Sequence, residues 1–197
     1  MSAELISPLV EHAMRVAAAQ HRSQNRKSTD LPYISHPASV ALILQRAGFH
    51  DENVLAAALL HDVVEDTGYA LETLQREFPA KVVEYVLALS ERKYDENGVK
   101  RPWKDRKQEH IAHAPTAPLE ARAILLADKL HNLFSIAFDL EAHGAGVWGR
   151  FNAGPRDLLW YHREMVKAAS HGDPRLEKLA AACTALIDRL EQSLGDA

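Results

Sequence analysis

The chain has 197 residues, 47% of them apolar, which is enough to build the core of one self-sufficient domain. Its formal net charge of −4, from 23 basic and 27 acidic residues, argues against a protein that holds nucleic acid through a general basic surface. No basic leader with an apolar segment and no run of about 18 apolar residues is found, so we expect a soluble cytoplasmic protein. The single cysteine, Cys183, fits a reducing compartment and is expected to be a buried, inert thiol.

The apolar residues recur at three- and four-residue spacing along the chain, and no segment alternates with a period of two. This spacing predicts an all-α protein, with prolines and glycines at the helix boundaries. The predicted helices are 4–22, 37–47, 51–65, 70–77, 80–92, 102–113, 117–142, 155–171 and 174–193.

Three connections between these helices are polar and long for a compact helical domain, and long polar loops often carry function. They are residues 22–35, 93–101 and 143–155. The first holds Arg26 and Lys27, and the third contains four glycines that allow it to fold over a ligand.

The stretch LLHDVVEDTG, at the end of the predicted helix 51–65, places four ionisable side chains in an apolar run. His61, Asp62, Glu65 and Asp66 fall within an arc of about 140° on a helix. The same helix is apolar nearly all round, which predicts a central position in the core. Buried carboxylates are costly unless they are paired or bind a metal. For His61 and Asp62, a hydrogen-bonded buried pair or a polar patch at the helix end is the alternative. For Glu65 and Asp66, the alternative is solvated acids in the last helical turn before Gly68.

Two other segments carry similar anomalies. In PYISHP, His36 precedes Pro37 at a predicted helix start, and in ILLADKLHN, Asp128 interrupts an apolar helix, with Asn132 one turn further on. Two imidazoles and two carboxylates, from His36, His61, Asp62 and Asp128, form a plausible ligand set for one divalent cation.

The motifs YISHP, ALLHDVVEDT and LLADKLHN, in this order, resemble those of HD-domain hydrolases of the RelA/SpoT homologue family, particularly the stand-alone small alarmone hydrolases. The resemblance covers about residues 10–170. It implies an HD-domain helical bundle, here a single domain over residues 1–197 with 174–193 as a C-terminal helix. It also implies one metal ion, usually manganese, held by the residues listed above, and removal of the 3′-pyrophosphate from guanosine tetraphosphate or pentaphosphate. Glu65 and Asp66 match the catalytic pair, although their individual roles stay open.

Six residues are candidates for binding the nucleotide: Arg26, Lys27, Asn132, Lys104, Arg150 and Asn152. The first three match positions that meet the nucleotide in the family. The other three are proposed from their loops, and ordinary surface roles are the alternative for all six. Guanidinium and ammonium groups suit phosphates, and an amide can both donate and accept.

Some residues near these motifs have a less specific interpretation. Arg106 shares with Lys104 the alternatives of phosphate contact and ordinary surface charge. His110 and His113, three residues apart, are expected to form the polar face of an amphipathic helix, with a pair of metal ligands as the alternative.

The chain departs from the better-known alarmone hydrolases at Phe134, where they carry an arginine, and in the segment 147–166. These differences leave a second hypothesis open, an HD phosphohydrolase of another phosphorylated nucleotide or dinucleotide. A non-catalytic binding or antitoxin-like module is the third. The expected partner is a small nucleotide, with neither nucleic acid nor a membrane involved.

Overall fold

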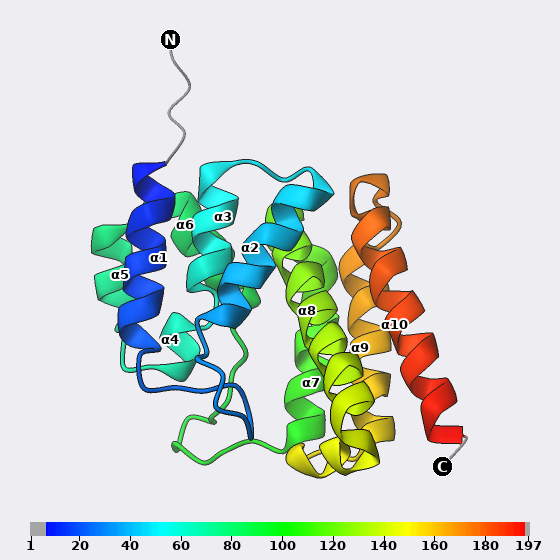
Figure 1. The fold of residues 1–197 in the computed structure, drawn as a ribbon. Helices are drawn as coiled ribbons and strands as arrows, with labels where there is room; N and C mark the ends of the chain where they lie inside the picture. Colours follow the sequence, from blue (N-terminus) through cyan, green and yellow to red (C-terminus); the bar gives the residue numbers. More distant parts are fainter. Residues whose placement is uncertain (1–6, 196–197) are drawn as a thin grey trace. The chain divides into compact units, whose positions relative to one another are not determined.

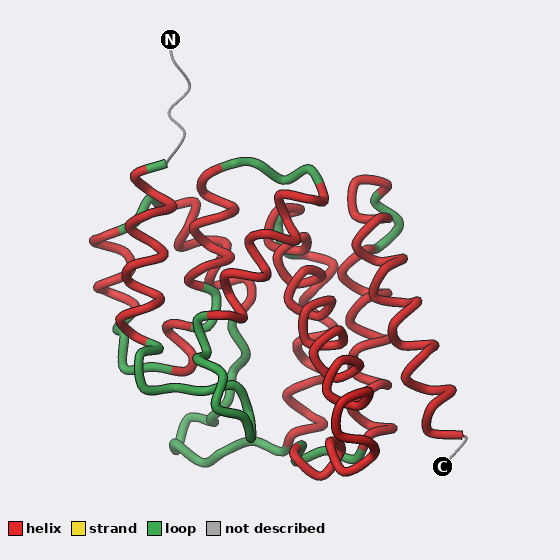
Figure 2. The backbone as a smooth tube through the Cα atoms, viewed as in Figure 1, coloured by secondary structure: helices red, strands yellow, loops and turns green. Residues whose placement is uncertain are grey.

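The structure, a computed structural model, describes residues 7–195, and all regular secondary structure in this range is helical (Figure 1 and Figure 2). The all-α prediction is confirmed. No described helix has the length and apolar content that a membrane span requires. The α-helices are α1 Pro8–Gln20, α2 Ser35–Ala47, α3 Glu52–Leu60, α4 Val63–Asp66, α5 Leu71–Glu77, α6 Ala80–Leu89, α7 Trp103–His113, α8 Leu119–His143, α9 Pro155–Ser170 and α10 Glu177–Gly195, and the 3₁₀ helices are η1 Ala114–Thr116, η2 Gly144–Arg150 and η3 Pro174–Leu176.

The chain divides into two compact units. The first comprises residues 1–90 and 118–124, and the second comprises residues 91–117 and 125–197. Helix α8 contributes its beginning to the first unit and the rest of its length to the second. The domain predicted over 1–197 therefore contains both units.

Helix α3 is the centre of the first unit, where α1, α2 and α6 all pack against it. Every residue from Val54 to Leu60 is buried, so no face of this helix is left to solvent. Asp51 begins the helix by accepting hydrogen bonds from the amides of Asn53 and Val54. The predicted central helix is confirmed, and the buried His61 directly follows its last residue.

The helix predicted over 51–65 is in fact two helices, because α3 ends at Leu60 and α4 begins at Val63. Asp62 has φ −101° and ψ −5°, close to the bridge region where many active-site residues lie. The Ala58 carbonyl, which lies in the last turn of α3, is 2.7 Å from His61 Nδ1. The His61 side chain thus forms a hydrogen bond to the backbone at the point where the regular hydrogen bonds of α3 end.

The second unit is built on α9, which packs against both α7 and α10. Cys183 on α10 is a buried free thiol, 3.5 Å from the Leu126 carbonyl oxygen of α8. Burial raises the pKa of this thiol to about 12, so the group stays protonated. The predicted buried, inert cysteine is confirmed.

Two further boundaries differ from those predicted. The segment 143–155 was expected to be a glycine-rich loop, but its residues 144–150 form the 3₁₀ helix η2. The C-terminal helix, predicted from 174, begins as η3 and becomes α10 at Glu177. Residues 4–6 of the first predicted helix lie outside the described range, and α1 begins at Pro8 with Ser7 as its cap.

Candidate metal centre

Three of the four predicted metal ligands lie together in the first unit. His36 stands in the first turn of α2, while His61 and Asp62 occupy the break between α3 and α4. Asp62 Oδ2 lies 3.0 Å from His61 Nε2 and 3.7 Å from His36 Nε2. Both imidazoles are buried, at 1% and 5% exposure, and their ring centroids are 5.2 Å apart. The predicted His/Asp cluster is therefore present.

The chemistry of this donor set suits a cation. With Nδ1 of His61 donating to the Ala58 carbonyl at 2.7 Å, Nε2 presents a lone pair to the carboxylate oxygen of Asp62. Two acceptor atoms facing each other at 3.0 Å repel unless a metal ion or a proton lies with them. A backbone partner on the second ring nitrogen is also the usual way to orient a metal-binding histidine.

Tyr33 belongs to the same cluster, although it was not predicted as a site residue. Its hydroxyl donates to Asp62 Oδ2 at 2.5 Å, across 29 residues of sequence. The residue lies within the YISHP motif, three positions before His36. Its place in that motif could have pointed to Tyr33. A tyrosine near a helix start is common, however, so the sequence alone did not distinguish it as a site residue.

The predicted catalytic pair lies on the single turn of α4. Glu65 is half-buried and Asp66 is exposed. The Asp66 amide donates to the Asp62 carbonyl at 2.8 Å, which ties this turn directly to a residue of the His/Asp cluster. The two carboxylates therefore follow the cluster by one turn, as the sequence predicts, and differ in their access to water.

The basic loop 22–35 is held closed by backbone hydrogen bonds. The Arg26 amide donates to the Leu31 carbonyl at 2.8 Å, and the Tyr33 amide donates to the Gln24 carbonyl at 2.9 Å. Arg26 is half-buried, with its guanidinium carbon 5.7 Å from the centroid of the Tyr33 ring, whereas Lys27 is exposed. Of the two predicted phosphate-binding cations, Arg26 is thus the one held against the cluster.

Asp128, the fourth predicted ligand, lies on the part of α8 that belongs to the second unit. Asp128 Oδ1 accepts a hydrogen bond from Asn132 Nδ2 at 2.6 Å, and its Oδ2 accepts one from Lys129 Nζ, also at 2.6 Å. Asp128 and Lys129 are both 8% exposed. Asn132, predicted to meet the nucleotide, therefore also orients the Asp128 carboxylate.

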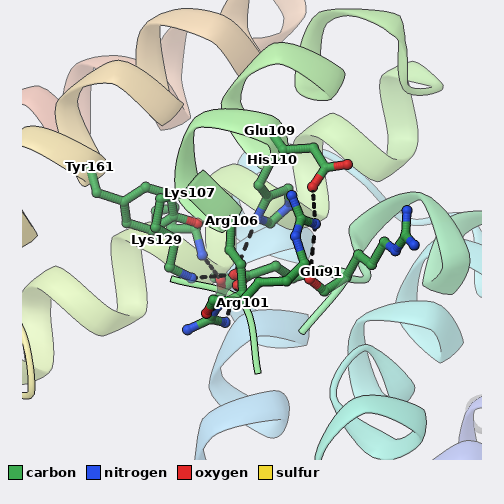
Figure 3. A network of polar contacts seen from close by, with 10 residues as sticks. Glu91, Arg101, Arg106, Lys107, Glu109, His110, Lys129 and Tyr161 are labelled. Atoms are coloured by element: carbon green, nitrogen blue, oxygen red, sulfur yellow. Dashed lines mark hydrogen bonds and ion pairs between the residues drawn. The ribbon is translucent and has the colours of Figure 1, made fainter. Parts of the chain in front are cut away.

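A buried ion network lies in the same unit (Figure 3). The two carboxylate oxygens of Glu91 bind Arg106 and Lys107 of α7, and Arg101 binds Glu109. This corrects the expectation for Arg106, which is neither a phosphate contact nor an ordinary surface charge, because Glu91 holds it at 8% exposure.

Tyr161 of α9 lies at the other side of this network. The ammonium nitrogens of Lys107 and Lys129 are 4.6 Å and 5.4 Å from the centroid of its ring. Its hydroxyl lies 3.2 Å from His110 Nδ1 (Figure 3). His110 was expected on a polar helix face, and this expectation is wrong, since its side chain is only 10% exposed. His113 is exposed, as expected.

Burial and neighbouring cations shift the pKa values in this network. Burial lowers the pKa of His110 to about 4, with Lys129 and Lys107 adding to the effect, and burial likewise lowers the pKa of His162 to about 3. Burial raises the pKa of Glu91, but Lys107 and Arg106 outweigh it and hold the pKa below its usual range. At neutral pH Glu91 is therefore ionised, and the His110 and His162 imidazoles are neutral.

The remaining predicted nucleotide contacts are also in the second unit. Arg150, at the end of η2, forms an ion pair with Asp139 of α8 at 2.7 Å. Asn152 is exposed, and Lys104 Nζ lies 5.6 Å from the ring centroid of Trp160. Phe134, where the resemblance to the alarmone hydrolases leads us to expect an arginine, is 57% exposed.

The model of the HD domain matches residues 13–156 of the chain. The zebrafish protein (Danio rerio) named guanosine-3′,5′-bis(diphosphate) 3′-pyrophosphohydrolase MESH1 is 40% identical over 119 residues, which cover 59% of this chain and 63% of the relative. The protein of the same name from Xenopus tropicalis is 39% identical over 127 residues, or 64% of this chain and 68% of the relative. The match thus extends over a little under two thirds of the zebrafish relative's own length.

Two solved structures have a similar fold. One, described as "A metazoan ortholog of SpoT hydrolyzes ppGpp and plays a role in starvation responses", has a TM-score of 0.77 and 28% identity, and the match covers 95% of this chain and 98% of that one. The other, lmo0812 from Listeria monocytogenes EGD-e, has a TM-score of 0.69 and 32% identity, with 79% and 97% covered.

These matches confirm the resemblance seen in the motifs. A probable GTP pyrophosphokinase from Mycobacterium leprae also matches, at 39% identity, but over only 16% of its length, so this chain corresponds to a small part of such larger proteins. Because the HD-domain model covers residues 13–156, which is more than half of the chain, the chain belongs to the HD-domain family.

Proposed function

We propose that the chain is a metal-dependent 3′-pyrophosphohydrolase that converts guanosine tetraphosphate and pentaphosphate to GDP and GTP with release of pyrophosphate. The observation that carries this proposal is the convergence of His36, His61 and Asp62 at the break between α3 and α4. Relatives at 39–40% identity are named for this activity, which supports the choice of substrate.

The proposed metal ligands are His36, His61, Asp62 and Asp128, and the proposed ion is a single Mn²⁺. A divalent ion bound there would polarise the phosphorus and lower the pKa of water. The protein's contribution is to orient the ligand side chains before the ion binds. Ala58 orients the His61 ring, and Asn132 orients Asp128.

Glu65 and Asp66 are the proposed catalytic groups. In the reaction, the oxygen of water forms a bond to the phosphorus attached to the 3′ oxygen, and the bond from that phosphorus to the 3′ oxygen breaks. Water loses a proton and the 3′ oxygen gains one. The half-buried Glu65 and the exposed Asp66 supply carboxylates for these two transfers one turn from the metal cluster.

The substrate carries phosphates that need cationic partners, and Arg26 is the leading candidate because the loop and Tyr33 hold it in place. We also assign Lys27 and Asn132 to the nucleotide. Arg150, Asn152 and Lys104 are assigned to its outer parts, and Arg150 would then exchange Asp139 for a phosphate. This small nucleotide, with no nucleic acid, is the proposed partner, and the protonated Cys183 thiol is in keeping with a cytoplasmic location.

A panel of nucleotides incubated with the purified chain and MnCl₂ tests this function. The panel comprises guanosine tetraphosphate, guanosine pentaphosphate, a dinucleotide phosphate and GTP. We expect turnover of the first two, with one pyrophosphate released per GDP or GTP formed. Phe134, an exposed aromatic in place of a cation, is the reason to include the dinucleotide. Turnover of the dinucleotide alone would transfer the proposal to that substrate, and turnover of nothing would favour a binding module.

A further inference from the structure

We propose that Tyr33 is a positioning residue that links the metal cluster to the basic loop, with its hydroxyl acting on Asp62 and its ring acting on Arg26. This inference rests on the proposed function for the role of Arg26. The part that concerns Asp62 depends only on metal binding.

The contact with Asp62 is direct. The Tyr33 hydroxyl donates to Asp62 Oδ2 at 2.5 Å, the same oxygen that lies 3.0 Å from His61 Nε2. A carboxylate that already accepts one hydrogen bond is restricted to fewer rotamers, so it loses less conformational entropy when it binds a cation. Partners of this kind orient the ligands of metal sites, and their removal costs roughly 10–100-fold in metal affinity.

The Tyr33 ring is itself held on two sides. Its centroid is 4.6 Å from that of His21, a side chain that is 2% exposed and whose Nδ1 lies 2.7 Å from Gln24 Oε1. The edge-on ring of His36 lies on another side, with its centroid at 5.7 Å. These contacts restrict the ring, so the hydroxyl reaches Asp62 from a defined direction.

The same ring supports the loop that carries the phosphate-binding candidates. Arg26 places its guanidinium carbon 5.7 Å from the Tyr33 centroid, within the range of a cation–π interaction. The Tyr33 amide bonds to the Gln24 carbonyl at 2.9 Å, which brings the two ends of the loop together. Movement of this one side chain would therefore disturb Asp62 and Arg26 together.

Two substitutions separate the hydroxyl from the ring. Tyr33→Phe keeps the ring and removes the donor, whereas Tyr33→Leu removes both. The matched control is Tyr69→Phe, because the Tyr69 hydroxyl donates to Glu77 at 2.7 Å, a carboxylate of the same unit outside the metal cluster. Mn²⁺ affinity is measured by equilibrium dialysis, and KM and kcat for guanosine tetraphosphate are measured at saturating Mn²⁺.

We expect Tyr33→Phe to weaken Mn²⁺ binding about 10-fold and to leave KM within about twofold of wild type. Tyr33→Leu should weaken Mn²⁺ binding to a similar extent and raise KM by about fivefold or more, in line with the loss of a cation–π contact. Tyr69→Phe should change neither quantity. Thermal melting of the metal-free variants identifies a fold defect, which would lower the number of Mn²⁺ sites and the apparent kcat through the folded fraction and leave KM unchanged.

Wild-type Mn²⁺ affinity in Tyr33→Phe would overturn the role on Asp62. An unchanged KM in Tyr33→Leu would overturn the role on Arg26. If the wild-type chain binds Mn²⁺ but does not hydrolyse the alarmone, the proposed function fails while the dialysis comparison still decides the role on Asp62. If the wild-type chain binds no Mn²⁺, both proposals fail.

Discussion

His61 and Asp62, neighbours in the sequence, face each other with 3.0 Å between Nε2 and Oδ2 at the point where helix α3 ends. In an uninterrupted helix, adjacent side chains point about 100° apart. Both residues lie at the break between α3 and α4, and Asp62 Oδ2 is also 3.7 Å from His36 Nε2. The local backbone irregularity and the candidate metal centre are one feature of this fold.

Neutralising the proposed catalytic carboxylates, Glu65 and Asp66, should separate chemistry from metal binding. Glu65→Gln and Asp66→Asn keep the size of each side chain and remove its capacity to move a proton. We expect kcat to fall by about 10²-fold or more in at least one of them, in the usual range for general acid–base groups, while Mn²⁺ affinity stays within about threefold. Steady-state kinetics and equilibrium dialysis check this pair of outcomes. Normal kcat in both variants would remove these residues from the mechanism.

The carboxylate of Glu91 should be important for stability, because its loss leaves the buried Arg106 and the half-buried Lys107 without their anion. Breaking a buried pair in this way typically costs about 3–5 kcal/mol. The control is Glu141→Ala, which breaks the exposed pair with Arg189 and should cost at most about 1 kcal/mol. Urea denaturation of Glu91→Ala and Glu141→Ala measures both. Equal effects of the two substitutions would contradict the assignment of Glu91 to a buried network.

Stability should fall as the pH drops below about 6.5, because the unfolded chain then protonates histidines that stay neutral in the fold. The pKa of His110 is lowered to about 4, so the unfolded state binds more protons between pH 6.5 and 4, and folding stability decreases across that window. At pH 5 the loss from His110 alone is about 2 kcal/mol.

His110→Gln tests this assignment. The variant should lose less stability than wild type between pH 7 and pH 5, as measured by urea midpoints at each pH. His162, with its pKa lowered to about 3, remains and retains part of the slope. Identical slopes in the variant and wild type would show that His110 is not buried and neutral.

Phe134 should tolerate a cation, since it is 57% exposed. Phe134→Arg introduces the arginine that the resemblance to the alarmone hydrolases leads us to expect at this position. We expect thermal stability within about 0.5 kcal/mol of wild type, as for most surface substitutions. If the natural substrate is the alarmone, KM for guanosine tetraphosphate should fall several-fold, because a phosphate gains a partner. The same substitution at Phe138, which is also exposed on α8, serves as the control and should leave KM unchanged.

The sequence was sufficient for the features that depend on local pattern. The apolar periodicity predicted α3 as a central helix, and Gly48, with φ +98°, ends α2 where a glycine was expected. The motifs identified the His/Asp cluster because buried charge is rare enough to stand out against an apolar helix.

Features that depend on contacts between residues far apart in the sequence could not be predicted from local pattern. The burial of His110 and Arg106 on α7 is set by Tyr161 on α9 and by Glu91, which lie far away in the sequence. The α3–α4 break also escaped prediction, because Leu60 to Val63 contains neither glycine nor proline and its periodicity continues through the break.

The central claim is that a bound divalent metal and the HD residues hydrolyse the alarmone, and a Mn²⁺ titration of pyrophosphate release tests it most directly. Metal-free chain should release none from guanosine tetraphosphate, and addition of Mn²⁺ should restore release, with one GDP formed per pyrophosphate. Asp128→Asn should show about 10²-fold less release or lower at the same Mn²⁺ concentration, while Asp105→Asn, on the exposed face of α7, should match wild type. Release that is independent of Mn²⁺, or equal in wild type and Asp128→Asn, would contradict the account.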